Sequence, residues 1–230
     1  MSLFDYLLDP TNWAGNDGIW ARLGEHLLFT ALAVGVAAVI AIPLGILIGH
    51  TGRGNFAVIG VSNAARSIPT LGLLVLMVLL LGTGRLGVSI PLIILALPPI
   101  LTATAAGVRG ADPDAVHAAV ALGMNPLQVV GRVEWPLALP LVTSGLRSAS
   151  LQVVATATVA AYAAAGGLGR LVLDGQKQGP GGYSQMFAGA LLVALLAIAL
   201  DGILGGVGWL LALRNRSRHG VEELALAPTV

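Results

Sequence analysis

Long apolar stretches, separated by short polar segments, dominate the pattern of this chain. A helix needs about 20 mostly apolar residues to cross roughly 30 Å of hydrocarbon. The pattern predicts five such helices, at Leu27–Gly49, Phe56–Leu81, Leu86–Val108, Leu137–Ala163 and Met186–Leu213. Asn63, Arg66 and Pro69 interrupt the second stretch. It is therefore either one span or a half-buried segment followed by a shorter span.

The longest polar interruption runs from Ala111 to Pro140 and carries two helix-start signals. Asp112 is suited to cap a helix, and Pro113 follows at the first helical position, where a missing N–H costs nothing. We expect this helix to reach about Leu122, with Val116, Ala119 and Val120 on one face. Gly123 then supplies a left-handed stop.

Asn125-Pro126 repeats the start signal and predicts a second short helix, with Leu127, Val130 and Glu134 on one stripe. The two helices would form a knob at the membrane surface. The simpler interpretation is an interfacial connector between two spans.

Composition places the chain in the bilayer. Its residues are 56% hydrophobic and only 10% charged, whereas soluble domains carry about 25% charged residues. The chain has no cysteine, which excludes disulfides and thiolate chemistry. A net charge of +1 gives no indication of a nucleic-acid partner. The fold class predicted is an all-α polytopic membrane protein.

Basic residues predict the orientation. Residues 1–24 have no basic residue before Arg22, so they do not resemble a secretory signal. They form a predicted extracytoplasmic or interfacial segment, with Trp13 and Trp20 suited to headgroup depth. With the N-terminus outside, the inner basic residues are Arg53, Arg109, Arg132, Arg214, Arg216 and Arg218, against Arg22, Arg85, Arg170 and Lys177 outside. This bias predicts a membrane domain at 25–213 and a cytoplasmic tail at 214–230.

The polar interruption also resembles a known motif, which runs Glu-Ala-Ala, three residues, Gly, nine residues, Ile, one residue, Leu-Pro. The matching positions are His117, Ala118, Ala119, Gly123, Val133, Trp135 and Pro136. This is similar to the EAA motif of ABC importer permeases, with His117 in place of the glutamate. The resemblance implies the type I importer permease (MetI-like) fold. It also implies that segment 111–136 is a coupling helix seated in a cleft of a separate ATPase.

The resemblance extends over about Glu25 to Leu210 and is most similar to permeases for glycine betaine, choline, carnitine and proline. It is carried by residues 66–74, 97–101, 108–113, 144–149 and 155–170. It implies two cytoplasmic ATPase subunits, a second permease that is identical or paralogous, and an extracytoplasmic solute-binding protein, all at a bacterial cell membrane.

The sequence contains no nucleotide-binding loop. Its only lysine, Lys177, lies in Gly-Gln-Lys-Gln-Gly, which is not the G-x-x-x-x-G-K-[ST] pattern. We therefore expect ATP and Mg²⁺ on a partner ATPase, and no cofactor, metal or catalytic residue on this chain. An intramembrane enzyme would need convergent catalytic groups, which the spans do not offer.

Polar residues inside the spans are candidates for the translocation path. Arg147 and Asp201 lie at membrane depth, where we favour an interhelical ion pair, or snorkelling for Arg147, over a role in the path. The small-residue run Ala155–Gly167 favours tight helix packing, with a pore wall or dimer contact as the alternative. The path or gating residues that we predict are Ser67, Pro69, Thr70, Thr156, Thr158 and Tyr162.

The predicted function is an ATP-driven importer permease for osmoprotectants. Alternatives are an importer of an amino acid such as methionine, and a membrane scaffold without transport. Quaternary ammonium ligands are usually held by aromatic cages, yet only 5% of the residues are aromatic. Capture specificity is thus expected in the binding protein, for which the outer loop Gly166–Tyr183 is a natural contact.

Overall fold

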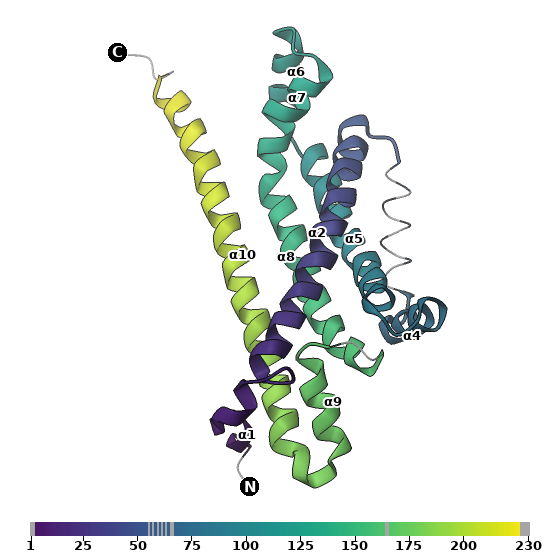
Figure 1. Cartoon of the computed structure of the whole chain (residues 1–230). Coiled ribbons are helices and arrows are strands. Elements are labelled where there is room, and N and C mark those ends of the chain that lie inside the picture. Colours follow the sequence, from purple (N-terminus) through teal and green to yellow (C-terminus); the bar gives the residue numbers. More distant parts are fainter. Residues whose placement is uncertain are drawn as a thin grey trace.

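Long helices, packed side by side, build the molecule. The computed structural model describes residues 3–225 except 55, 57, 59, 61, 63, 65, 66, 164 and 165. The principal helices are α2 (Ile19–Thr51), α5 (Arg85–Arg109), α8 (Trp135–Ala160) and α10 (Tyr183–Ala225). Helices α2, α5 and α8 pack against one another, and α10 packs along α8 (Figure 1). The described residues contain no strand, so the all-α prediction is confirmed.

Within the described part of the chain, 4 helical segments are long and apolar enough to cross a membrane: Ile19–Thr51, Leu86–Arg109, Pro126–Ala160 and Gly179–Leu211. The remaining predicted span is divided. Its second part is α4 (Thr70–Leu81), a helix of 12 residues, which at about 1.5 Å per residue is too short to cross roughly 30 Å. The interrupting residues Asn63 and Arg66 lie outside the described residues. The helix begins after Pro69, as the two-part interpretation requires.

Two predicted boundaries were wrong. The first span begins at Ile19 rather than Leu27, and includes Arg22 and Glu25, which pair with each other. The fourth begins at Pro126 rather than Leu137, because the polar segment before it continues the same helical rod. In both cases polar residues extend the helix beyond the apolar stretch. The hydrophobic pattern alone does not predict this extension.

Small residues allow the helices to approach closely. A side-chain carbon placed on Gly45 would lie 2.6 Å from Cβ of Thr104, and one on Gly49 would lie 2.6 Å from Cβ of Val108. These contacts join α2 to α5. The core around them is rich in alanine: Phe29, Ala33, Ala37, Ala41, Leu74, Val88, Leu92, Ala96, Ile100, Ala149, Val153, Ala157 and Ala160. Such close packing is how membrane helices associate without a hydrophobic driving force between them.

The N-terminal end is closed by short elements. Helix α1 (Asp5–Leu8) and the 3₁₀ turn η1 (Pro10–Trp13) precede α2. The hydroxyl and the backbone N–H of Thr11 donate to Asp9, and these hydrogen bonds lower the pKa of the Asp9 carboxyl below its ordinary value. Residues 3–24 are therefore folded at the end of the bundle, and the last of them already belong to the first long helix.

Two contacts hold α2 at this end, one to the loop before α9 and one to α8. The N–H of Gly167 donates to Glu25 at 2.8 Å. The fully buried His26 lies with Nε2 at 3.1 Å from the carbonyl oxygen of Val154 on α8. Helix α9 (Gly169–Lys177) follows that loop, and the 3₁₀ turn η4 (Gly179–Gly182) leads into α10.

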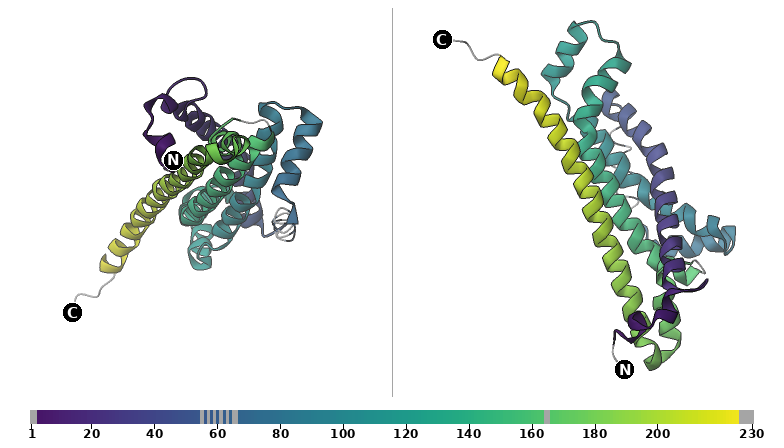
Figure 2. Two further views of the ribbon diagram at one scale, coloured as in Figure 1. Left: turned by 90° about the horizontal axis from the view of Figure 1, so that it is seen from below. Right: turned by 60° about the vertical axis from the view of Figure 1, so that its left-hand side comes forward.

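The two ends of the bundle differ. Helices α1 and α9 lie at the same end as the N-terminus, whereas α6 (Pro113–Ala121) and α7 (Pro126–Val129) lie at the other end (Figures 1 and 2). Helix α10 rises to this second end, so the end of α10 near Ala225 shares it with the polar segment. The arrangement agrees with the predicted placement of the C-terminus and segment 111–136 on one side of the membrane.

Candidate coupling site

The first helix of the polar segment forms as its start and stop signals predict. The Asp112 carboxylate accepts the N–H of Asp114 at 2.9 Å, with Pro113 in the first turn. The helix ends at Ala121, and Gly123 follows with φ of +83°. Only glycine adopts that left-handed conformation without strain. The predicted turn between the two helices is confirmed.

The second helix begins as predicted but does not end. The Asn125 side chain accepts the N–H of Gln128 at 3.0 Å, and the Gln128 side chain accepts the N–H of Asn125 at 2.9 Å, which completes a capping box. After α7 the chain passes through a π-helical turn, η2 (Val130–Glu134), directly into α8. The first helix is short and separate as predicted, but the expectation that the second helix is also short was wrong, because the helical backbone continues through η2 into α8 even though Pro136 and Pro140 lack an N–H.

The π turn also changes which side chains face inward. We expected Leu127, Val130 and Glu134 to share one stripe. Instead Leu127 is exposed, whereas Val129 and Glu134 are buried. A π turn holds one more residue than an α turn, and it rotates the residues that follow. The polar segment is thus a short helix folded against the end of one continuous rod that reaches into the membrane domain.

The motif residues divide into an outer and an inner group. His117 and Ala118 are exposed on α6, while Ala119 is 4% exposed. Val133, Trp135 and Pro136 are half-buried, and Trp135 packs against the cluster of Val108, Ala138 and Val142. His117, Ala118 and Gly123 are therefore accessible from outside, whereas Ala119, Val133, Trp135 and Pro136 are buried or half-buried.

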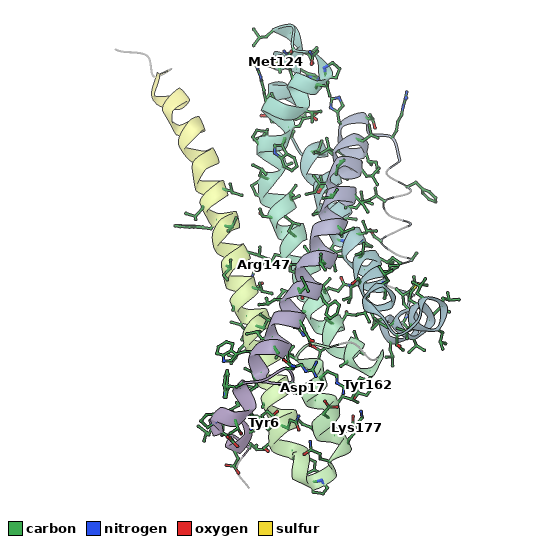
Figure 3. The ribbon with its side chains drawn as sticks, viewed as in Figure 1. Tyr6, Asp17, Met124, Arg147, Tyr162 and Lys177 are labelled. Carbon is green, nitrogen blue, oxygen red and sulfur yellow. The ribbon has the colours of Figure 1, made fainter. Side chains whose placement is uncertain are left out.

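An apolar tip surrounds the outer group. Its large exposed side chains are Val120, Leu122 (80% exposed) and Leu127 (84% exposed), with Met124 at the same end (Figure 3). Exposed apolar side chains in contiguous positions, ringed by polar residues, mark interaction surfaces. The tip is an exposed apolar surface at the end of the rod that carries the motif.

A histidine and a carboxylate connect this segment to α2, a link that the pattern analysis missed. His50 Nδ1 lies 2.9 Å from both carboxylate oxygens of the buried Glu134. Beside the pair is an apolar groove of about 340 Å³ between the end of α2 and α7. A carboxylate at the edge of an apolar stretch was the available signal, but its partner is 84 residues away. A displacement of segment 111–136 therefore either moves α2 with it or breaks the contact between His50 and Glu134.

The predicted path residues lie on elements that touch. Ser67, Pro69 and Thr70 are exposed where α4 begins, and α4 contacts α8 and the 3₁₀ turn η3 (Ala161–Ala163). Thr156 and Thr158 on α8 donate to the carbonyls of Gln152 and Val154, at 2.8 and 3.1 Å.

Tyr162 differs from those threonines because it is exposed, and its hydroxyl donates to Gln176 of α9 at 2.7 Å. The buried Ala157, Ala160 and Ala161 agree with the tight packing expected of this run.

Arg147 and Asp201 form the interhelical ion pair that we favoured. The guanidinium of Arg147 on α8 donates to both carboxylate oxygens of Asp201 on α10, near mid-length of the bundle (Figure 3). A paired charge inside the bilayer costs far less than an isolated one. The pair therefore joins α10 to α8, and the predicted pairing is confirmed.

The architecture is that of a multi-pass membrane permease with the helical segment 111–136 at one end of the bundle. A family model described as binding-protein-dependent transport system inner membrane component matches residues 41–208. The match covers most of the chain and includes the whole coupling segment. The chain belongs to this family of inner-membrane transport components, whose permeases work with an ATPase and a solute-binding protein.

Similar proteins carry related names. The chain is 36% identical over 183 residues to the carnitine transport permease protein OpuCD of Listeria monocytogenes, covering 80% of this chain and 82% of the relative. It is 30% identical over 228 residues to the choline transport system permease protein OpuBD of Bacillus subtilis, covering 99% and 100%.

A solved structure shares the fold. The inward-facing MetNI methionine ABC transporter matches with a TM-score of 0.71 at 24% identity, covering 84% of this chain and 95% of that chain. This likeness confirms the type I importer permease fold and says nothing further about the transported solute.

Proposed function

We propose that this chain is the transmembrane permease of an ATP-driven importer for osmoprotectants such as glycine betaine, choline, carnitine or proline. The observation that carries the proposal is the similarity at 30% identity or more to permeases named for carnitine and choline, in one case over 99% of this chain. The methionine alternative is supported by fold alone, because its solved relative is 24% identical.

The coupling segment supports an ATP-driven mechanism. The outer group of α6 and the apolar tip enter a cleft of the ATPase, and closure of the ATPases displaces this tip. Because α7, η2 and α8 form one helical rod, the displacement reaches mid-membrane without a hinge. The His50–Glu134 contact carries the same movement to α2. His117 replaces the motif's glutamate, so it contributes a hydrogen bond to the ATPase rather than a fixed negative charge.

The assembly consists of two permeases, two ATPases and one binding protein. ATP and Mg²⁺ bind the ATPases, and this chain makes and breaks no covalent bond. The end that holds α1 and α9 is extracytoplasmic and receives the binding protein, with the loop Gly166–Tyr183 as one contact. Solute enters between the two permeases, near the path residues Ser67, Pro69, Thr70, Thr156, Thr158 and Tyr162.

Uptake by the reconstituted transporter tests the proposal. The permease is placed in proteoliposomes with its partner ATPase and binding protein, and it is supplied with radiolabelled glycine betaine, choline, carnitine, proline or methionine. We expect ATP-dependent uptake of at least one osmoprotectant, and none when the ATPase lacks its nucleotide-binding lysine. Methionine uptake without osmoprotectant uptake would contradict the substrate assignment. Absence of ATP dependence would contradict the transporter assignment.

A further inference from the structure

The N-terminal segment, residues 3–18, has one apolar face turned to the bundle and another turned away from it. The side chains that pack against the buried cluster at this end of the bundle are Tyr6, Leu7 and Trp13. The large apolar side chains on the outer face are Leu3, Phe4 and Leu8, which are 51%, 50% and 76% exposed. An element that is apolar on both faces has no face suited to water.

Polar groups of the N-terminal segment are paired within the segment itself. The side-chain amide of Asn12 donates to the carbonyl of Tyr6 at 2.9 Å, and Nε1 of Trp13 donates to the carbonyl of Leu7 at 2.8 Å. The carbonyl of Phe4 accepts the N–H of Leu7 at 3.0 Å. Backbone groups that leave water for a membrane need partners inside the protein. These groups have such partners.

Trp20, at the beginning of α2, relates this segment to the depth of the membrane. Its side chain is 63% exposed, whereas the neighbouring Trp13 is half-buried. Trp20 and Leu27 are seven residues apart and therefore share one face of α2, and Leu27 is the first residue of the long apolar run. The helix rises about 10 Å between them. Interfacial segments are buried over roughly 5–10 Å, and exposed tryptophans are enriched at that depth.

The exposed apolar face of α2 continues from Trp20 into the spanning part of the helix. Leu27, Leu28 and Leu32 are exposed below it. In a helix that crosses the bilayer, exposed apolar side chains of this kind meet lipid. The outer face of the N-terminal segment is thus the continuation of a lipid-facing surface.

The N-terminal segment also lies at the edge of the bundle. It contacts α2 and α10, and the rings of Phe4 and Phe187 on α10 meet edge to face with their centroids 5.2 Å apart. Seen along the bundle from this end, the segment lies beside the other helices rather than over their middle (Figure 2). A position at the side favours the surrounding lipid over a protein that docks across the end of the bundle.

We propose that the N-terminal segment is an interfacial anchor whose outer side chains Leu3, Phe4 and Leu8 insert, together with Trp20, among the lipid headgroups on the side that holds α1 and α9. The anchor holds the beginnings of α2 and α10 at one depth. Because no basic residue precedes Arg22, burial of apolar surface, and not attraction to anionic headgroups, drives the insertion. The partner is therefore a zwitterionic lipid surface.

Spin labels measure the depth of the anchor, because the chain has no cysteine and a single introduced cysteine is labelled alone. Leu8→Cys carries the label on the anchor, and Leu3→Cys repeats the measurement on the same face. Val39→Cys in the spanning part of α2 and Leu122→Cys on the apolar tip are the references. The side chains at positions 8, 39 and 122 are matched in exposure, at 76%, 75% and 80%.

The full-length permease is reconstituted in phosphatidylcholine vesicles, and two probes are compared at each label: oxygen, which enters the bilayer, and a polar nickel complex, which stays in water. We expect the ratio of oxygen to nickel accessibility at Leu8→Cys to exceed that at Leu122→Cys by at least about threefold, because insertion by roughly 5–10 Å excludes the polar complex. Val39→Cys should give the highest ratio.

Two results would overturn the proposal. One is a ratio at Leu8→Cys and Leu3→Cys equal to that at Leu122→Cys, which would place the outer face in water. The other is a label that becomes shielded from both probes only when the solute-binding protein is added, which would assign this face to that protein.

Discussion

The contact between His50 and Glu134 gives the sharpest energetic prediction. The Glu134 side chain is 7% exposed and that of His50 is 28% exposed, and Nδ1 reaches both carboxylate oxygens at 2.9 Å. Interhelical hydrogen bonds in membrane proteins average about 0.6 kcal/mol and reach about 1.7 kcal/mol. Those to charged groups are worth about 1.5–3 kcal/mol. A bifurcated bond to a buried carboxylate belongs at the upper end, so we expect a coupling energy of about 1.5 kcal/mol, roughly a tenfold change in the unfolding equilibrium.

A double-mutant cycle measures this coupling. The wild type, His50→Ala, Glu134→Ala and the double variant are unfolded by increasing SDS in mixed micelles, and helix content is followed by circular dichroism. Each single variant should already lose the contact, so the second substitution costs less in the presence of the first. The double variant should therefore be less destabilised than the sum of the two single variants, by the coupling energy. Distant, independent sites add within about 0.3–0.5 kcal/mol. Additivity within that margin would refute the link between α2 and the coupling segment.

Three further variants probe other parts of the account. Gly145→Leu should destabilise the bundle by about 1–3 kcal/mol, measured as a lower Tm. The reason is that a Cβ at position 145 lies 2.5 Å from the Cβ of Ala103. An unchanged Tm would contradict the close packing of α5 and α8. Gly123→Val should strain the turn by at least about 1–2 kcal/mol, because the backbone there has φ of +83°. ATP-driven uptake should fall when it is compared at equal permease content. Full uptake would show that the turn is dispensable. The single variant Arg147→Leu should reduce the yield of folded protein more than the double variant in which Asp201→Leu is added. The single change leaves an unpaired carboxylate in the membrane, whereas the double change removes both charges. Equal yields would contradict the pairing.

The parts of the fold that depend on local chemistry were predictable from the sequence. Apolar length located the long helices, and Asp112, Gly123 and Asn125 marked turns and caps that form as expected. Hydrophobic periodicity did not predict the π turn at 130–134 or the continuity of α7 with α8. Both features lie where Glu134 is buried and Trp135 packs against the bundle, contacts that periodicity along the chain does not contain.

The candidate site was predictable as a segment but not residue by residue. Motif spacing placed Ala119 in the docking segment, yet it packs inward, and the apolar surface belongs to neighbours such as Leu122. Long-range pairs such as His50 with Glu134 have no local signature.

The central claim is that the α6–α7 tip docks an ATPase, and co-purification tests it most directly. Leu122→Glu places a charge on a tip side chain that is 80% exposed, and Leu8→Glu does the same at the opposite end on a side chain that is 76% exposed. Both variants should fold, because neither side chain is buried. We predict that the affinity-tagged Leu122→Glu permease loses the ATPase while Leu8→Glu retains it. An ATPase yield unchanged by Leu122→Glu would contradict the account.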